Sequence, residues 1–355
     1  MLFRSYQRQG RTNEALRQFA KALELRPKWA PLYRGRAHIF LGVTDLSPEL
    51  REMTLSKLED VIGNLSQQRR DAAFRDLASA IRYESPGNHL IAADWLKSAA
   101  LLRTAGRHKD ALGACDAALK IADRYAAGHE LRIKLLLDLK KFDELIESCN
   151  AVLQWLPASA RIYELRGIAK NAIGDFSGAI GDFTRSIELS GEDDRPRLLC
   201  YRGWTYEAST AHRPAFQDFD AAIRLAPTNA EAYLGRGMVR ARVGQYRDAE
   251  IDAETARKHG DSSAKFAIRV ARVYGQAAIA VSAEVRVTRL SADKLVRHYQ
   301  ELAMKMVRTA LERTPAGERA TFFRQTINLT DPPLQPIRKW LEVLERNLIG
   351  QPSPR

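Results

Sequence analysis

Apolar residues recur along this chain at spacings of three and four residues, the period of one face of an α-helix. Each apolar stripe lasts about a dozen residues and ends at glycine, proline or a short polar stretch. From residue 160 to residue 260 the whole pattern occurs three times, with a period of about 34 residues. The pattern therefore predicts pairs of short helices in a tandem array.

The three segments from 160 to 260 agree column by column. The matching positions are Tyr163, Leu199 and Tyr233; the pairs Arg166-Gly167, Arg202-Gly203 and Arg236-Gly237; Gly174 and Gly244; Ala179, Ala215 and Ala249; and Phe183, Phe219 and Ala253. The glycines at 174 and 244 fall where the first helix of a pair should end, and the alanines open the second helix. The same register runs back through positions 111 and 145 to about residue 88.

Helices of this length are not stable alone in water, and one pair cannot bury its apolar face. Neighbouring pairs must therefore stack, with large side chains filling the layers between them. We expect the rings of Tyr163, Phe183, Phe219 and Tyr233 to be buried in these layers, each contributing about 2 kcal/mol.

An aromatic residue, a small residue, an A-x-x-x-F pattern and then proline together resemble the tetratricopeptide repeat. The resemblance implies an all-α fold: a right-handed α-α superhelix of about seven helix-pair repeats with a C-terminal helical cap. It also implies that function lies on the concave wall, which the first helix of each pair lines.

The sequence predicts a repeat domain over residues 1–260 and capping helices with a tail over 261–355. Residues 1–29 match the repeat from Gly10 onward, but its first helix should begin about five residues before Met1, so the chain is expected to open within a repeat. Residues 30–87 are degenerate: helices are expected up to Gly42, from Ser47 onward, and from Gln67 to Tyr83, with their pairing left open. Regular repeats occupy 88–260.

The C-terminal segment is expected to form helices over about 265–281, 291–313, 316–328 and 337–348, with Asp331-Pro332-Pro333 separating the last two. This segment resembles the tails of large bacterial tetratricopeptide proteins. The sequences that carry the resemblance are ARVYGQAA (271–278), RHYQELAMKMVRTALERTP (297–315) and ERATFFRQ (from 318) followed by DPPLQPIR (331–338). Such proteins often carry a serine/threonine kinase or another signalling domain. One alternative that the resemblance implies is therefore that this chain is a regulatory segment of a larger protein.

Charge adds a second alternative. The chain is 45% hydrophobic and 28% charged, which suits a helical solenoid, and its formal net charge is +13. Residues 265–355 hold 16 lysines and arginines against 8 aspartates and glutamates. This excess allows nucleic-acid binding through the C-terminal helices. Because the bases alternate with Leu and Val at helical spacing, a solvated helix face is favoured instead.

Chemistry-bearing patterns are absent from the sequence. It contains no phosphate-binding glycine loop, no kinase signature and no H-E-x-x-H or C-x-x-C pattern. Three cysteines make neither a disulfide framework nor a metal set, and Cys115 and Cys149 occupy the column of Phe183 and Phe219. We therefore assign no enzymatic role, cofactor or metal. With no secretory leader and no long apolar run, a cytoplasmic location without a membrane partner is expected.

Positions of the first helices that point away from the packing columns should face the concave groove. They hold Lys97, Arg103, Lys134, Arg161, Asn171, Arg197, Tyr201, Trp204, Met238 and Arg242. Tyr201 and Trp204 lie three residues apart on one face, and such rings anchor interfaces. Arg161, Arg197 and Arg242 carry guanidinium groups suited to carboxylates or phosphates. In the alternative interpretation, Trp204 packs on a neighbouring helix and the charges are simply solvated.

The sequence thus favours a non-catalytic scaffold that binds a protein or peptide partner in the concave groove. The partner is then a segment of another protein or a domain of a larger parent protein. Nucleic-acid binding and regulation of a fused kinase are the alternatives.

Overall fold

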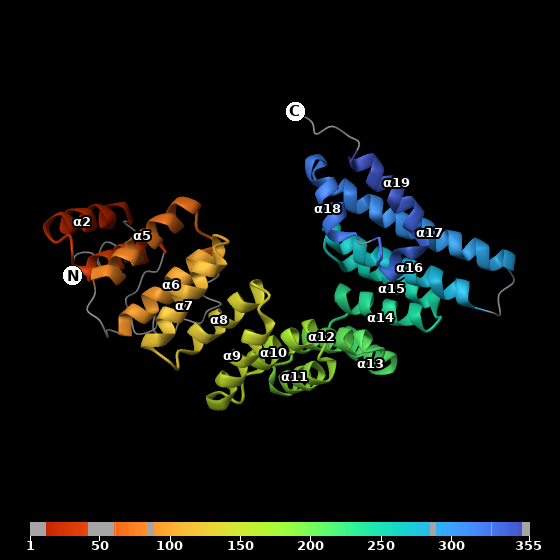
Figure 1. Ribbon diagram of the computed structural model, residues 1–355, viewed down its shortest axis with the longest axis horizontal. Coiled ribbons are helices and arrows are strands. Elements are labelled where there is room, and N and C mark those ends of the chain that lie inside the picture. Colours follow the sequence, from red (N-terminus) through yellow and green to blue (C-terminus); the bar gives the residue numbers. More distant parts are fainter. Residues whose placement is uncertain are drawn as a thin grey trace. The chain divides into compact units, whose positions relative to one another are not determined.

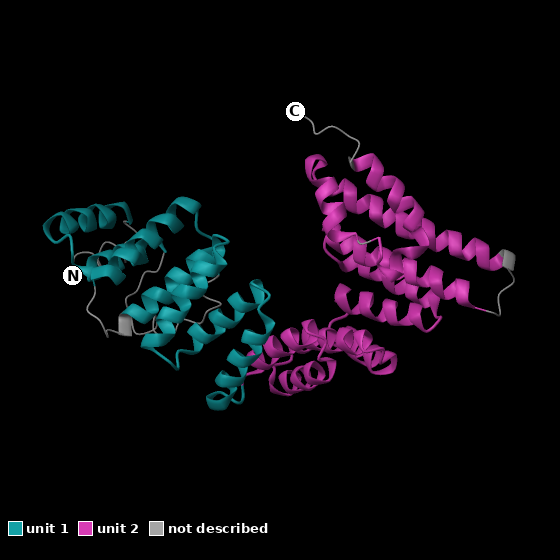
Figure 2. Cartoon of the chain, in the orientation of Figure 1, with its two compact units in different colours: residues 1–158 teal, residues 159–355 magenta. Residues whose placement is uncertain are grey.

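The computed structural model describes residues 12–41, 60, 62–83, 89–284, 289–327 and 329–349 (Figure 1). Every regular element within these ranges is a helix, so the fold is all-α, as the sequence predicts. The chain divides into two compact units, Met1–Ala158 and Ser159–Arg355 (Figure 2). The domain boundary expected near residue 260 stays a prediction. No helix in the described ranges is long and apolar enough to cross a membrane.

The first unit consists of short helices that pack on their neighbours in sequence. They are α2 (Thr12–Leu25), α3 (Ala30–Phe40), α5 (Gln67–Tyr83), α6 (His89–Thr104), α7 (His108–Ile121), α8 (Ala126–Asp138) and α9 (Phe142–Trp155). Helix α5 has the predicted bounds and packs against α3, which settles a pairing that the sequence left open. The predicted helix from Ser47 and the first eleven residues lie outside the described part of the chain.

The second unit begins with three regular helix pairs and ends in helices of unequal length that are irregularly connected. The pairs are α10 (Ala160–Ala172) with α11 (Phe176–Leu189), α12 (Arg195–Ala208) with α13 (His212–Leu225), and α14 (Ala230–Arg242) with α15 (Tyr246–His259). The cap comprises α16 (Ala264–Ala283), α17 (Arg289–Glu312), the 3₁₀ turn η2 (Ala316–Glu318), α18 (Arg319–Thr326), the 3₁₀ segment η3 (Pro332–Ile337) and α19 (Arg338–Ile349).

The small and aromatic columns of the repeat form the core of the second unit. Phe183 and Phe219 are fully buried, as expected, and so is the alanine that precedes each by four residues. A Cβ placed on Gly203 would come within 2.9 Å of the Phe219 ring, so this crossing of α12 and α13 tolerates only glycine without movement. Cys115 and Cys149 are buried in the same column of the first unit.

The tyrosine column behaves differently from the prediction. Tyr163 and Tyr233 are only partly buried. The guanidinium carbon of Arg166 lies 5.3 Å from the Tyr163 ring centroid, and that of Arg236 lies 5.5 Å from the Tyr233 centroid. These rings therefore pack beneath arginines at the edge of the layer, where cation–π attraction supplements the smaller buried area.

Those arginines also form a ladder of ion pairs, which was not predicted from the sequence. Each arginine of the Arg-Gly column binds the carboxylate sixteen residues later in the second helix of its pair. The ladder comprises Arg166–Asp182, Arg202–Asp218 and Arg236–Asp252, each joined by two hydrogen bonds of 2.6–3.0 Å. The three aspartates are buried. The two helices of each pair are thus joined by a bidentate contact as well as by apolar packing.

The turn between the two helices of a pair requires one residue with positive φ, in the left-handed backbone conformation. Gly174 and Gly244 have φ of 84° and 83°, which confirms the predicted helix stops, and Gly106 has φ of 75° at the equivalent turn of an earlier pair. At the equivalent turns of two other pairs the same conformation is held by Lys140 (φ 56°) and Thr210 (φ 62°). The turn geometry is therefore kept even where glycine is absent.

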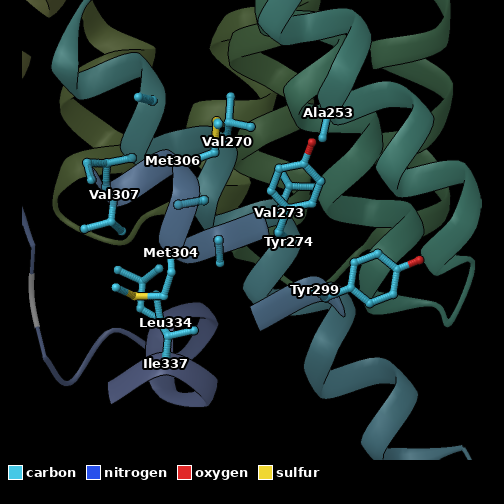
Figure 3. Packing of buried hydrophobic residues seen from close by; sticks show 14 of the residues in the cluster. Ala253, Val270, Val273, Tyr274, Tyr299, Met304, Met306, Val307, Leu334 and Ile337 are labelled. Carbon is cyan, nitrogen blue, oxygen red and sulfur yellow. The ribbon is translucent and has the colours of Figure 1, made fainter. Parts of the chain in front are cut away.

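The cap joins the three C-terminal sequence segments into one core (Figure 3). Tyr274 of α16 and Tyr299 of α17 are fully buried, and Leu334 and Ile337 of η3 are buried with them. Arg272 Nε donates to Asp331 at 2.6 Å, and Gln300 Nε2 donates to the carbonyl of Pro336 at 2.8 Å. The prolines at 332 and 333 separate α18 from α19, as predicted.

Candidate functional site

A pocket of about 340 Å³ lies between α12, α14 and α16 in the second unit. Its lining residues are Arg197, Cys200, Tyr201, Trp204, Asn229, Glu231 and Arg269. Arg197, Tyr201 and Trp204 are three of the ten residues predicted to face the concave wall. This volume is near the lower end of the range of about 300–1,000 Å³ that is usual for ligand pockets. The pocket therefore suits a single large side chain.

Tyr201 forms an exposed wall of the pocket. Its side chain is 37% exposed, although its ring stacks on the buried Phe183 with centroids 5.8 Å apart. The Arg197 guanidinium carbon lies 5.7 Å from the centroid of the Tyr201 ring. The ring is thus held between a buried aromatic and a cation while part of it remains accessible.

Trp204 forms a second wall and is more deeply packed. Its ring meets Phe219 edge-on with centroids 5.2 Å apart, and its Nε1 donates to Glu231 Oε1 at 2.5 Å. The Arg269 guanidinium lies over the same ring at 5.7 Å and also pairs with Glu231. Trp204 therefore packs on neighbouring helices, as in the alternative interpretation of the sequence, and also lines the pocket.

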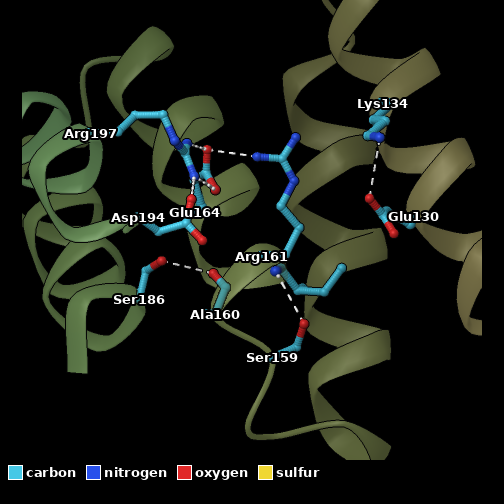
Figure 4. Close-up of polar contacts among 10 residues, drawn as sticks. Glu130, Lys134, Ser159, Ala160, Arg161, Glu164, Ser186, Asp194 and Arg197 are labelled. Carbon is cyan, nitrogen blue, oxygen red and sulfur yellow. Dashed lines mark hydrogen bonds and ion pairs between the residues drawn. The ribbon is translucent and has the colours of Figure 1, made fainter. Parts of the chain in front are cut away.

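Arg197 is anchored by two carboxylates (Figure 4). It binds both oxygens of Glu164 on α10, and its Nη2 lies 2.9 Å from Asp194 Oδ1. Glu164 is only 3% exposed and also pairs with Arg161 at 2.7 Å. The two arginines share one buried carboxylate, which fixes the orientation of Arg197 at the pocket rim.

The polar groups at the pocket floor are structural. The Asn229 side chain caps α14 by accepting from the backbone amide of Ala232 at 3.1 Å. Burial raises the pKa of the Cys200 thiol to about 12, so this thiol stays protonated near neutral pH. Among the described residues no cluster of three His, Cys, Asp or Glu side chains is arranged to hold a metal.

The other charged residues predicted for the groove are engaged by neighbouring side chains. Arg103 Nε donates to Asp138 at 2.6 Å, Arg242 pairs with Glu207, and Lys134 pairs with Glu130 at 3.2 Å. Asn171 is half-buried near the end of α10.

Several of these contacts join the first helices of consecutive repeats. Arg103–Asp138, Arg197–Glu164, Arg242–Glu207 and Arg269–Glu231 each span two repeats. Three of the four arginines, Arg103, Arg197 and Arg242, were predicted from the sequence to face the groove, but their pairing with carboxylates was not predicted. Their separations of 33 to 38 residues, close to the repeat length, are the signal that could have revealed the pairs.

Two residues predicted to face the groove are buried instead. Lys97 is 7% exposed because α3 lies against α6, where the Lys97 ammonium is 2.7 Å from His38 Nε2 and 3.9 Å from Asp94. Met238 is 6% exposed because α16 covers α14, and it belongs to the cap core. For both residues the prediction was wrong, since neither offers a surface to a partner.

We compared this chain with known protein families, curated protein sequences and solved structures. No protein-family model and no curated protein sequence matches the chain. A tetratricopeptide repeat protein from Parabacteroides merdae is 18% identical, with a TM-score of 0.53 over 72% of this chain and 99% of that structure. A MamA protein from Desulfovibrio magneticus is 19% identical, with a TM-score of 0.42 over 50% of this chain and 99% of that structure.

A third structure, YrrB, is described as a tetratricopeptide protein with an unusual peptide-binding site. It is 14% identical, with a TM-score of 0.40 over 60% of this chain and 99% of that structure. The similarity to the Parabacteroides structure, with a TM-score above 0.5, indicates a shared fold. Together with the helix pairs and the repeat columns, it shows that this chain has the fold of tetratricopeptide repeat proteins.

Proposed function

We propose that the chain is a non-catalytic scaffold that binds a peptide segment of another protein across α12, α14 and α16. One large apolar or aromatic side chain of that peptide inserts into the pocket between Tyr201 and Trp204. The observation that carries this proposal is the partly exposed Tyr201 ring, held in place by Phe183 and Arg197 at the mouth of a pocket.

The residue types at this pocket are those that dominate binding energy at interfaces. Tyrosine, tryptophan and arginine are enriched among hot spots, which cluster in well-packed pockets. Here all three types line the pocket, and their side chains are already fixed by stacking and ion pairs. Binding therefore requires little additional ordering of these side chains, which favours affinity.

The ion pairs also limit which peptides fit. Arg197 and Arg269 are each bound to a glutamate from the preceding first helix. Because these cations are already neutralised, the pocket selects for an apolar anchor more than for a run of acidic residues. A peptide backbone running past the rim can still accept from guanidinium N–H groups that the glutamates do not use.

A peptide selection tests this proposal directly. A random displayed peptide library is selected against the full chain, and affinities are measured by fluorescence anisotropy with synthetic labelled peptides. We expect a recurring large apolar or aromatic residue. We also expect Tyr201→Ala to weaken binding at least about 10-fold, which corresponds to about 1.4 kcal/mol.

The matched control is Ile251→Ala, which removes an apolar side chain that is 62% exposed on α15 and outside the pocket. Circular dichroism should show unchanged helix content in both variants. Binders that keep full affinity for Tyr201→Ala and for Trp204→Phe would contradict the assignment of this pocket.

A further inference from the structure

A second groove lies in the cap, on elements that the pocket does not use. It has a volume of about 710 Å³ and is bordered by α17 and α19. Its lining includes Met304, Lys305 and Arg308 from α17, and Trp340, Val343 and Leu344 from α19. This groove belongs wholly to the second unit.

The α19 side of this groove is apolar and open. Trp340 is 43% exposed and Val343 is 46% exposed, and their spacing of three residues places them on one face of the helix. Met304 is buried and Leu344 is half-buried between the helices. Two large exposed side chains beside a partly filled apolar floor form a surface on which another apolar face can pack.

The middle of the α17 side of the groove supplies positive charge, and Glu301 and Glu312 lie at the two ends of that side. Lys305 and Arg308 are exposed and one turn apart, and neither forms an ion pair with any described residue. Lys305 also acts on the Glu254 carboxylate through its charge, but Glu254 is already bonded to Arg257 and to the Tyr274 hydroxyl. The two bases in the middle of the groove are therefore available to an acidic partner.

We propose that this cap groove binds an amphipathic α-helix of a partner protein. The apolar face of that helix packs on Trp340 and Val343, and acidic residues beside the face pair with Lys305 and Arg308. The lining of α17 runs from Glu301 to Glu312, about 16 Å at 1.5 Å per residue, which accommodates about three turns of a helix. The basic excess of residues 265–355 also favours an acidic partner at long range.

Two other occupants fit less well. The residues after α19, Gly-Gln-Pro-Ser-Pro-Arg, contain neither an acidic nor a large apolar side chain. A nucleic-acid backbone would bring phosphates close to Glu301 and Glu312 at the two ends of the α17 stripe, and it would leave Trp340 and Val343 without an apolar partner.

The test is a selection with the full chain against a displayed library of designed helices. Each library member carries leucine, isoleucine or phenylalanine on one face and randomised residues beside that face. We expect aspartate and glutamate to be enriched at the randomised positions. Among the selected helices, we expect at least about 10-fold weaker binding to Val343→Asp and to the double variant Lys305→Glu/Arg308→Glu.

Two matched controls separate this groove from other surfaces. Lys339→Glu reverses an exposed base of α19 outside the lining, and Ile251→Asp adds the same charge to an exposed apolar position of α15. Both should bind the helices as the unsubstituted chain does, and so should Tyr201→Ala. Trp340→Ala, checked for helix content, gives an independent measure of the apolar contact.

Three outcomes would overturn the proposal. The first is that selection yields no helix weakened by Val343→Asp and by Trp340→Ala. The second is enrichment of basic or neutral residues beside the apolar face. The third is that a single-stranded oligonucleotide binds the chain, binds the Lys305→Glu/Arg308→Glu variant more weakly, and binds Val343→Asp with unchanged affinity. This pattern would identify a nucleic-acid surface.

Discussion

The carbonyl oxygen of Pro333 rests against the α-carbon of Gly275, so closely that a Cβ at position 275 would lie 1.8 Å from that oxygen. Gly275 is in the middle of α16, and Pro333 begins the buried part of η3. The missing side chain lets the connection between α18 and α19 lie directly on α16. This contact, together with the hydrogen bond from Arg272 to Asp331, brings the C-terminal segments 271–278 and 331–338 together.

Gly275→Ala should therefore destabilise the cap. The clash is with backbone, which cannot rotate away, so we expect a loss of about 2–4 kcal/mol in the free energy of unfolding, measured by chemical denaturation. Gly181→Ala on α11 is the control, because nothing lies within 4 Å of its added Cβ. It should stabilise the chain by about 0.5–1 kcal/mol. Equal effects of both substitutions would contradict this account.

The left-handed turns make a second prediction. Lys140 and Thr210 hold a backbone conformation that glycine adopts without strain. We expect Lys140→Gly and Thr210→Gly each to raise the free energy of unfolding by about 0.5–1 kcal/mol. Gly174→Ala and Gly244→Ala should lower it by a similar amount, since open space surrounds both positions and only φ opposes the change. Thermal denaturation followed by circular dichroism measures all four.

The arginine ladder predicts a strong asymmetry between single and double substitutions. Arg202→Met leaves the buried Asp218 carboxylate unpaired, and we expect a loss of about 3 kcal/mol. The double variant Arg202→Met/Asp218→Leu should recover much of that loss, because no buried charge remains. Arg185→Met, which breaks an exposed pair with Glu188, should have no measurable effect. A double variant no more stable than Arg202→Met would contradict the explanation that the unpaired Asp218 carboxylate causes the loss.

A buried histidine predicts a pH dependence in the first unit. Burial, together with the charges of Lys97 and Arg34, lowers the pKa of His38 to about 2 from an ordinary 6.5. Below pH 6.5 the unfolded chain binds a proton at His38 that the folded chain excludes. The free energy of unfolding is therefore highest above the unfolded pKa and falls as the pH decreases below it, by about 1.4 kcal/mol for each pH unit.

His38→Gln should flatten this slope between about pH 6.5 and pH 4.5. Hydrogen exchange of the α3 and α6 amides measures the local free energy of opening at each pH. Parallel slopes for the original chain and His38→Gln would show that other groups control the pH response.

The repeat columns predicted the helices well because period and residue size are local properties of the sequence. Phe219 and Ala215 needed only their spacing to be assigned to the core, and Gln67 to Tyr83 needed only its apolar stripe. Lys97 failed because its environment depends on α3, which belongs to the stretch whose helix pairing the sequence left open. The Gly275–Pro333 contact joins positions 58 residues apart without any periodic relation, so no pattern could reveal it.

Three residues that line the pocket, Arg197, Tyr201 and Trp204, were named from the sequence, but the carboxylates that bond Arg197 and Trp204 were not. Tyr201 and Trp204 were identified because their columns were expected to point away from the packing positions, although Trp204 also packs on Phe219. The partners of Arg197 and Arg242 were overlooked because each arginine was considered within its own repeat, while its carboxylate lies in the preceding one. Comparing charges at offsets near the repeat length would have found both.

These inter-repeat pairs have a consequence for how such an array can be inherited. The acid and the base of each pair reside on different repeats, as with Glu164 and Arg197 or Glu231 and Arg269. Deleting or transplanting one repeat would remove one partner from each pair that crosses the junction, although Glu164 would keep its ion pair with Arg161. A segment that carries neighbouring repeats together keeps both members of such a pair, so the unit that preserves these contacts is larger than a single helix pair.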